Sequence, residues 1–253
     1  MINIAVPTEL VELTKRLGDP SKDYSILAEG NTSMRIDADV FMVKASGYSM
    51  TSIESTGFVA MRFSGVLGLL DVPDLALSDL KVGLAAARVD PANKTQPSIE
   101  VCLHAILLTL GQANYVGHTH PTAWNSILCS TIAEQASTGR LFPDQVVVCG
   151  PAALYIPYTD PGVPLAREVK RRLVEYLDRY HSPPKEILMQ NHGLIALGTS
   201  AAEVERVMAM SVKAARILLG TYSVSQPNFL SEADITHLWT RPDEIERRAL
   251  LIR

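Results

Sequence analysis

The chain has 253 residues, of which 47% are hydrophobic and 20% are charged. This length suits one large domain or two small ones and allows a substantial core without stabilising disulfides or metals. Binding to nucleic acid or to an anionic membrane calls for clustered positive charge, and a formal net charge of −4 gives no sign of it. The composition therefore predicts neither partner.

The cysteine content indicates a reducing environment. Cys102, Cys129 and Cys149 are odd in number and widely spaced, which argues against a disulfide framework. We expect all three to be reduced and to lie in or near the core. The N-terminus lacks a basic segment followed by a long apolar run, and no stretch reaches about 18 consecutive apolar residues, so we predict no signal peptide, no membrane span and a cytoplasmic location.

Helical and strand-like patterns alternate in the first half of the chain. Leucines at helical spacing predict a helix over 7–17. Short β-rich runs between turn-forming residues predict strands over 32–37, 39–45 and 57–63. Short helical pieces follow within 64–90, and 90–97 is a polar loop. Ser98 is expected to cap a buried apolar helix that runs to about Leu110, with Glu100 in its first turn.

The second half continues the alternation. Strands are predicted over 114–119, 145–149, 154–156, 186–190 and 193–197, and helices over 122–131, 163–180, 200–221 and 242–250. Alternating elements define an α/β class. No repeat, low-complexity tract or linker divides the chain, so we predict a single domain over 1–253 with a polar C-terminal tail from about 222.

Three histidines are candidates for a metal site. His118 and His120 are two residues apart at the end of a predicted strand, so their side chains point to the same side. His192 lies at the junction of two predicted strands. Three nitrogen ligands with one open position make a catalytic zinc site, whereas a closed structural site uses four ligands, usually with thiolates.

Each histidine also has a simpler explanation. A lone His-x-His pair is a weak signal, and a turn or cap would account for His192 between Asn191 and Gly193. His104 lies within the apolar helix and is expected to be a hydrogen-bonded core residue. His181 precedes Ser-Pro-Pro in a predicted surface turn, and His237, in the polar tail, is given no role.

Five short segments, taken in order, strengthen the metal hypothesis. They are LAEGNTS at 27–33, VKASG at 43–47, PSIE at 97–100, GHTHP at 117–121 and QNHGL at 190–194. Together they resemble the class II aldolase/adducin family, which includes fuculose-phosphate and rhamnulose-phosphate aldolases and ribulose-phosphate 4-epimerase. The resemblance spans about 5–220 and is nearest to the aldolase portion of bifunctional rhamnulose-phosphate aldolase/dehydrogenase proteins, although no dehydrogenase motif follows here.

The resemblance carries specific expectations. It implies a three-layer fold with a central mixed or antiparallel sheet flanked by helices, and a homotetramer with active sites at subunit contacts. It implies Zn²⁺, or another divalent metal, on His118, His120 and His192, and it makes Glu100 the catalytic carboxylate. It places a phosphate or other anion near Gly30, Asn31, Ser46, Gly47 and Ser98.

Two positions depart from the family pattern. Phosphate-cleaving members commonly carry two serines before the glutamate, but this chain has Ile99 beside Ser98, so one hydroxyl donor to the anion is missing. Lys44, two residues before Ser46 on the same predicted strand, is a candidate to compensate, and the alternative is an ordinary solvated strand residue. The tyrosine that family aldolases supply from a neighbouring subunit does not align, and Tyr48, Tyr155 and Tyr158 are all candidates.

The resemblance implies metal-dependent carbon–carbon bond cleavage. Zinc bound to a carbonyl and an adjacent hydroxyl would stabilise an enediolate, and Glu100 would move the proton at the neighbouring carbon. The leading hypothesis is an aldolase acting on a ketose 1-phosphate or related hydroxy-carbonyl compound. A decarboxylase of a keto or aromatic acid and a retro-aldol 4-epimerase use related chemistry. A non-enzymatic adducin-like scaffold would lack the metal ligands, which are all present here.

Overall fold

The computed structural model describes residues 4–251, so the first three residues of the N-terminal segment, where no signal peptide is predicted, lie outside it, as do residues 252–253. The strands are β1 (Asn31–Arg35), β2 (Val40–Lys44), β3 (Phe58–Arg62), β4 (Tyr115–Thr119), β5 (Leu154–Ile156), β6 (Glu186–Met189) and β7 (Gly193–Gly198). The α-helices are α1 (Thr8–Leu17), α2 (Phe63–Gly68), α3 (Leu77–Ala86), α4 (Val101–Thr109), α5 (Thr122–Leu128), α6 (Ala133–Thr138), α7 (Pro143–Cys149), α8 (Val163–Tyr180), α9 (Ala201–Val224), α10 (Glu232–Thr240) and α11 (Pro242–Leu251).

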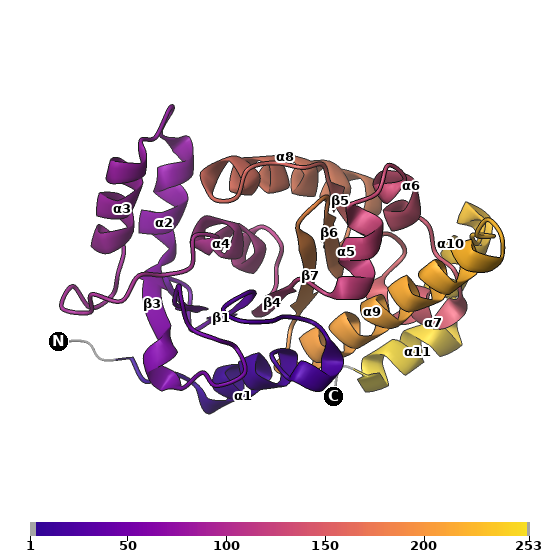
Figure 1. Cartoon of the computed structure of the whole chain (residues 1–253), viewed down its shortest axis with the longest axis horizontal. Helices are drawn as coiled ribbons and strands as arrows, with labels where there is room; N and C mark the ends of the chain where they lie inside the picture. The colour runs from indigo at the N-terminus through magenta and orange to yellow at the C-terminus, as the bar shows by residue number, and fades with distance from the viewer. Residues whose placement is uncertain (1–3, 252–253) are drawn as a thin grey trace.

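One seven-stranded sheet runs through the molecule in the order β3-β2-β1-β4-β7-β6-β5. Neighbouring strands are antiparallel except β5 and β6, which are parallel. Helices lie on both sides of this sheet: α4 and α8 cover one face, and α1 and α9 the other (Figure 1). This arrangement confirms the predicted α/β class and the central, mostly antiparallel sheet between helical layers.

The central strands are apolar on both faces because each face meets a helical layer. Side chains alternate along a strand. In β7, Ile195 and Leu197 join the core beneath α4 and α8, while Leu194 and Ala196 join the core beneath α1 and α9. Gly117 of β4 allows a close helix approach, because a Cβ there would meet Leu17 and Val204 at 2.7 and 2.8 Å. No helix within residues 4–251 combines the length and apolar composition needed to cross a membrane.

Residues 145–149 do not form the predicted strand. They belong to helix α7, which begins at Pro143 and ends before Gly150, whose φ of 83° turns the chain. Proline suits the first turn of a helix because its missing N–H has no partner there. A short run of buried valines fits a buried helix as well as a strand, since periodicity alone does not separate the two. The strand prediction was therefore wrong.

The other differences between prediction and structure concern the ends of two helices, the exposure of Cys129 and the C-terminal tail. The helix predicted over 122–131 ends at Leu128, and Cys129 is exposed, which contradicts its predicted place in or near the core. Helix α9 continues to Val224. The tail contains helix α10, which was not predicted. This helix begins with a reciprocal capping box between Ser231 and Asp234. Short polar helices of this kind have a weak apolar pattern, and the cap is their clearest signal.

A buried ion pair fixes the start of β6. Arg140 and Glu186 are both fully buried, and Arg140 Nη1 donates to Glu186 Oε1 at 2.7 Å. The same guanidinium donates to the carbonyls of Cys149 and Gly150 at 3.2 and 2.9 Å. The pair therefore ties the end of α7 to β6, whose far end leads into His192.

Removing one partner of this pair should strongly destabilise the fold. Arg140→Met leaves the Glu186 carboxylate buried without a cation, so the free energy of unfolding should fall by about 3–5 kcal/mol in urea denaturation. Adding Glu186→Leu to Arg140→Met should recover much of the loss, because no charge then remains buried. The exposed pair between Arg179 and Glu232 provides a control, and Arg179→Met should have little effect. If Arg140→Met lowered the free energy of unfolding no more than Arg179→Met does, the stabilising role of the Arg140–Glu186 pair would be contradicted.

Candidate metal and active site

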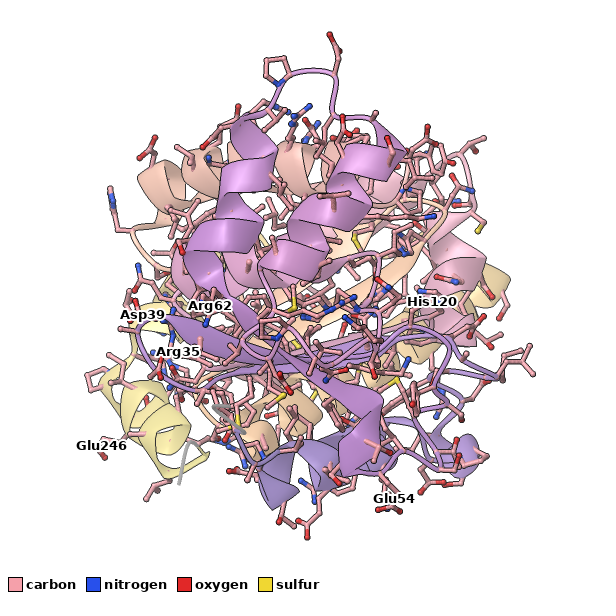
Figure 2. All side chains as sticks on the ribbon, turned by 90° about the vertical axis from the view of Figure 1, so that its left-hand side faces the viewer. Arg35, Asp39, Glu54, Arg62, His120 and Glu246 are labelled. Atoms are coloured by element: carbon pink, nitrogen blue, oxygen red, sulfur yellow. The ribbon has the colours of Figure 1, made fainter. Side chains whose placement is uncertain are left out.

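The predicted site residues gather at one end of the sheet. Figure 2 shows the molecule from the β3 side, with His120 at the opposite end of the sheet from Arg35 and Arg62. Asn31, the first residue of β1, pairs in register with His118 of β4. The antiparallel pairing of β1, β4 and β7 therefore brings the start of β1, the end of β4 and the start of β7 together.

Three imidazoles converge at this end. The ring centroids of His118, His120 and His192 lie 4.7 to 5.2 Å apart, and one ligand nitrogen from each falls within 4.8 Å of the others. Asn191 adopts a left-handed φ of 53°, which asparagine tolerates, and turns the chain from β6 into His192. Gly193 must lack a side chain, because a Cβ would lie 2.8 Å from the His120 ring.

Hydrogen bonds fix the orientation of His118. Its Nδ1 lies 3.0 Å from the carbonyl oxygen of Leu194, which can only accept, so Nδ1 carries the proton. The neutral ring then presents the lone pair of Nε2 to the centre of the cluster, where His120 Nε2 lies 2.9 Å away. Glu29 Oε1 lies 3.8 Å from the other nitrogen of His120, Nδ1.

Glu100 lies beside the imidazoles. Its carboxylate is 3.0 Å from His192 Nε2 and 3.5 Å from His118 Nε2, and the residue is 4% exposed. Burial raises the pKa of Glu100. His118, His192 and Asn31 lower it by more than burial raises it, so the pKa lies well below its usual range. Glu100 is therefore an ionised carboxylate at neutral pH. Helix α4 begins at Val101, so its N-cap residue is Glu100 and not Ser98 as predicted; Ser98 Oγ accepts from the Glu100 N–H at 3.2 Å.

A buried network holds Glu100 in place. Asn31 Nδ2 donates to Glu100 Oε2 at 2.7 Å and to Ser98 Oγ at 3.1 Å. Asn31 Oδ1 pairs with Nε2 of His104, and Nδ1 of His104 lies 2.6 Å from Ser33 Oγ. His104 is thus a hydrogen-bonded core residue, as predicted. The sequence analysis did not predict that His104 orients Asn31. Its position four residues after Glu100 could have indicated that the two side chains lie close together, because residues four apart share one face of a helix.

Two of the three imidazoles, those of His118 and His120, are neutral at physiological pH. Burial lowers the pKa of His118 to about 3 and also lowers the pKa of His120. Protons therefore do not compete with a cation for these nitrogens near pH 7.

The residues present fit a divalent metal ion. Glu100 Oε1 is buried and accepts no well-aligned hydrogen bond, although His192 Nε2 is only 3.0 Å away. Three imidazole nitrogens beside an incompletely satisfied carboxylate oxygen form a donor set suited to a divalent cation. Three imidazoles suit zinc, and also copper, iron or nickel.

The six predicted anion-binding residues line one cavity of about 250 Å³. Glu100, His120 and His192 line the same cavity, and Ile99, 57% exposed, stands at its edge. The other lining residues from the predicted set are Gly30, Asn31, Lys44, Ser46, Gly47 and Ser98. The structure thus brings together every residue that the resemblance singled out, and the buried His118 lies 3.5 Å from Glu100.

Lys44 is a buried residue. It is 2% exposed, so the alternative of a solvated strand residue is wrong. Its Nζ has only long contacts, at 3.4 and 3.5 Å, to the carbonyl oxygens of Ala28 and Ala45. Burial lowers the pKa of Lys44 to about 8, while Glu100 acts in the opposite direction. The ammonium remains largely charged at neutral pH and has capacity for a further acceptor.

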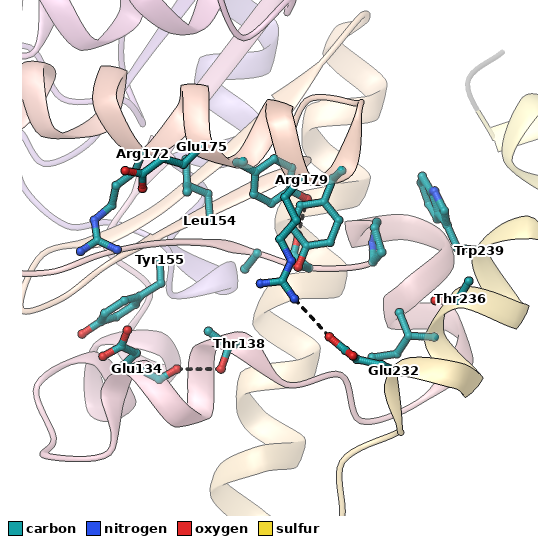
Figure 3. Close-up of a pocket in the computed structure, with 16 residues that line it drawn as sticks. Glu134, Thr138, Leu154, Tyr155, Arg172, Glu175, Arg179, Glu232, Thr236 and Trp239 are labelled. Atoms are coloured by element: carbon teal, nitrogen blue, oxygen red, sulfur yellow. Dashed lines mark hydrogen bonds and ion pairs between the residues drawn. The ribbon is translucent and has the colours of Figure 1, made fainter.

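The tyrosine candidates separate in the structure. Tyr155 is buried and lines a different cavity of about 740 Å³ between β5, α6, α8 and α10 (Figure 3). That cavity is larger, but none of the imidazoles lines it. Tyr48 and Tyr158 are exposed, and the Tyr158 hydroxyl donates to Asp160 at 3.1 Å. No tyrosine lines the 250 Å³ cavity within the described residues.

The chain belongs to the class II aldolase/adducin family. The sequence profile of the Class II Aldolase and Adducin N-terminal domain matches residues 8–219. No curated protein sequence matches the chain.

Solved structures share the fold. The N-terminal class II aldolase domain of a conserved protein from Thermoplasma acidophilum is 23% identical over 87% of this chain and 97% of its own, with a TM-score of 0.65. An L-fuculose 1-phosphate aldolase is 14% identical over 93% and 96%, with a TM-score of 0.67. YgbL from Escherichia coli, whose description leaves aldolase, epimerase and decarboxylase activity open, is 16% identical over 92% and 96%, with a TM-score of 0.67.

Acid should destabilise the metal-free protein partly through His104. Burial lowers the pKa of this residue in the folded protein to about 4, against an ordinary 6.5. Between these pH values the unfolded chain binds a proton that the folded protein does not, so the free energy of unfolding falls as the pH falls, by about 3 kcal/mol in total. Denaturant unfolding of His104→Gln at pH 6.5 and pH 4 should show a smaller decrease than the wild-type protein; an equal decrease would contradict this pKa.

Proposed function

We propose that the protein is a metal-dependent aldolase, with zinc as the preferred ion, that cleaves a ketose 1-phosphate or related hydroxy-carbonyl compound. The observation that carries this proposal is the buried carboxylate of Glu100 within 3.5 Å of two of three convergent imidazoles, at the wall of a cavity. Family membership and the fold shared with an L-fuculose 1-phosphate aldolase support it.

The roles of the residues follow from their chemistry. His118, His120 and His192 would hold the ion, which supplies a Lewis acid for charge developing on a carbonyl oxygen. Glu100 would move the proton at the carbon beside that carbonyl, because it is ionised, faces the cavity and is held in place by Asn31. Three protein ligands leave room for two substrate oxygens.

The cavity supports an anionic substrate. Lys44 supplies a cation, and Asn31, Ser46 and Ser98 add polar groups along the same wall. Gly30 and Gly47 have φ values of 70° and 83°, and open space around Gly47 lets a ligand approach its backbone. Ile99 contributes no donor, so Lys44 would take over part of the charge neutralisation that a second serine provides elsewhere in the family.

We also infer that the active unit is a homotetramer in the cytoplasm. Large apolar side chains are exposed around the site, including Ile26, Leu27, Ile99 and Tyr158, at 57 to 83%. A neighbouring copy packed against this rim would bury them and could bring a tyrosine as the second acid or base. The three free cysteines fit a reducing compartment.

The released product separates the candidate reactions. Zinc analysis should give about one ion per chain, and a screen of ketose phosphates and keto acids should yield an aldehyde from a ketose phosphate. Release of carbon dioxide from a keto acid would instead establish a decarboxylase, and interconversion of two sugar phosphates without net cleavage would establish an epimerase. Absence of bound metal and of every product would favour a scaffold.

Glu100→Gln should separate metal binding from proton transfer. The amide keeps the shape but has no base, so kcat should fall by about 10²–10⁴-fold while zinc occupancy is retained. His118→Ala should lose both zinc and activity, because it removes a proposed ligand. Metal content by mass spectrometry and turnover should be measured on the same samples. Full turnover in Glu100→Gln would refute its role as the base.

A further inference from the structure

A chain of buried polar side chains leads from Glu100 into the core between β1 and α4. It runs through Asn31 and His104 to Ser33, which are 6%, 1% and 0% exposed. Neither His104 nor Ser33 lines the cavity at the imidazoles. Any effect of these two residues on a reaction in that cavity must therefore pass through Asn31.

The spacing of β1 matches that of the start of α4. Asn31 and Ser33 are two residues apart on the strand, so they share a face and lie roughly 6.7 Å apart along it. Glu100 and His104 are four residues apart, which is about 6 Å along a helix axis. His104 can therefore contact both strand residues while Asn31 also reaches Glu100.

The hydrogen bonds in this chain have a fixed direction. The Glu100 carboxylate can only accept, so Asn31 presents Nδ2 to Oε2 at 2.7 Å. Asn31 Oδ1 then faces His104 Nε2, which must donate. Burial lowers the pKa of His104 to about 4, so the ring is neutral near pH 7 and carries one proton. Nδ1 of His104 therefore accepts from the Ser33 hydroxyl at 2.6 Å.

The opposite direction fails at both ends of the chain. With the His104 proton on Nδ1, Nε2 would need a donor and the Asn31 amide would have to turn over. Asn31 Oδ1 would then occupy the position 2.7 Å from Glu100 Oε2, where two acceptors repel. The Ser33 hydroxyl would also lose its acceptor, because Nδ1 is its only partner within residues 4–251. A buried group without a partner is costly, so Ser33 favours the Nε2–H form of His104.

We propose that Ser33 is a positioning residue for Glu100, because its hydroxyl fixes the tautomer of His104 and thereby the orientation of the Asn31 amide that holds the carboxylate. The inference rests on the proposed function and deepens it, since it extends the support of the base to a residue outside the cavity. Without the hydroxyl, Asn31 and Glu100 would spend less time in the arrangement suited to proton transfer, while the proposed metal ligands keep their positions.

Nitrogen NMR tests the chain without requiring turnover. In the metal-free protein labelled with ¹⁵N-histidine, His104 should carry its proton on Nε2 at pH 7, and its signals are assigned by their loss in His104→Gln. In Ser33→Ala, the Nδ1 signal should move toward that of a nitrogen without a hydrogen bond. A proton on Nδ1 of His104 in the wild-type protein would overturn the proposal.

Turnover of the substrate found in the screen separates positioning from a purely structural role. Ser33→Ala should lower kcat about five- to tenfold, as expected for one net hydrogen bond, with KM and zinc content unchanged. Ser33→Thr keeps the hydroxyl and should restore kcat. His104→Leu should lower kcat at least as much as Ser33→Ala does. His104→Gln should retain most of the activity, because its amide N–H can replace the donor to Asn31.

Ser211→Ala is the matched control. Ser211 is also fully buried, and its hydroxyl accepts from Trp124 Nε1 at 2.8 Å, but it has no hydrogen bond to the chain that ends at Glu100. This variant should lower the thermal unfolding temperature and leave kcat unchanged.

The outcomes distinguish the positioning role from the proposed reaction. A wild-type kcat in both Ser33→Ala and His104→Leu, with both variants folded and zinc-loaded, would overturn the role of Ser33. If the wild-type protein converted no ketose phosphate or keto acid, the aldolase proposal would fail, whereas a proton on Nε2 of His104 would still support the directed chain.

Discussion

A buried carboxylate is the constraint on which the site depends. Ionised Glu100 sits at 4% exposure with no cationic side chain in direct contact, and such a group is costly unless it is hydrogen-bonded or paired. Asn31 provides the hydrogen bond, and His104 holds Asn31 in the orientation that donates. Burial keeps His118 and His120 neutral near pH 7, so their ring nitrogens beside this carboxylate are available to a divalent cation.

The sheet makes this arrangement possible. Helices cover both of its faces, so the imidazoles and Glu100 meet a cavity only at one end of the sheet. The antiparallel register places Asn31 opposite His118, and the β6–β7 turn returns His192 to the same point. The Arg140–Glu186 pair secures β6 at its other end, away from these residues.

Two cavities adjoin His120. One is lined by Lys44 and the glycine turns, the other by Asp23 and Asn125, and Glu29 lines both. Large apolar side chains are exposed at both cavities, Ile99 at the first and Ile26 at the second.

The sequence by itself determined the local features. The two-residue spacing of His118 and His120 at a strand end dictates that they share a side, and apolar periodicity defined most strands and helices, including α8 at its observed limits. The run of valines in α7 was ambiguous. A buried segment is apolar throughout, so it lacks the pattern of polar positions that distinguishes a strand from a helix. Helix α10 was not predicted because its apolar residues also lack a clear helical periodicity.

Only the tertiary structure decided the environments of the side chains. The burial of Lys44, the exposure of Cys129, the link from His104 through Asn31 to Glu100, and the shared wall at Glu29 all depend on segments far apart in the chain. Local spacing fixes where a side chain points, but its pKa, its partners and the cavity it faces are set by whatever the fold packs against it.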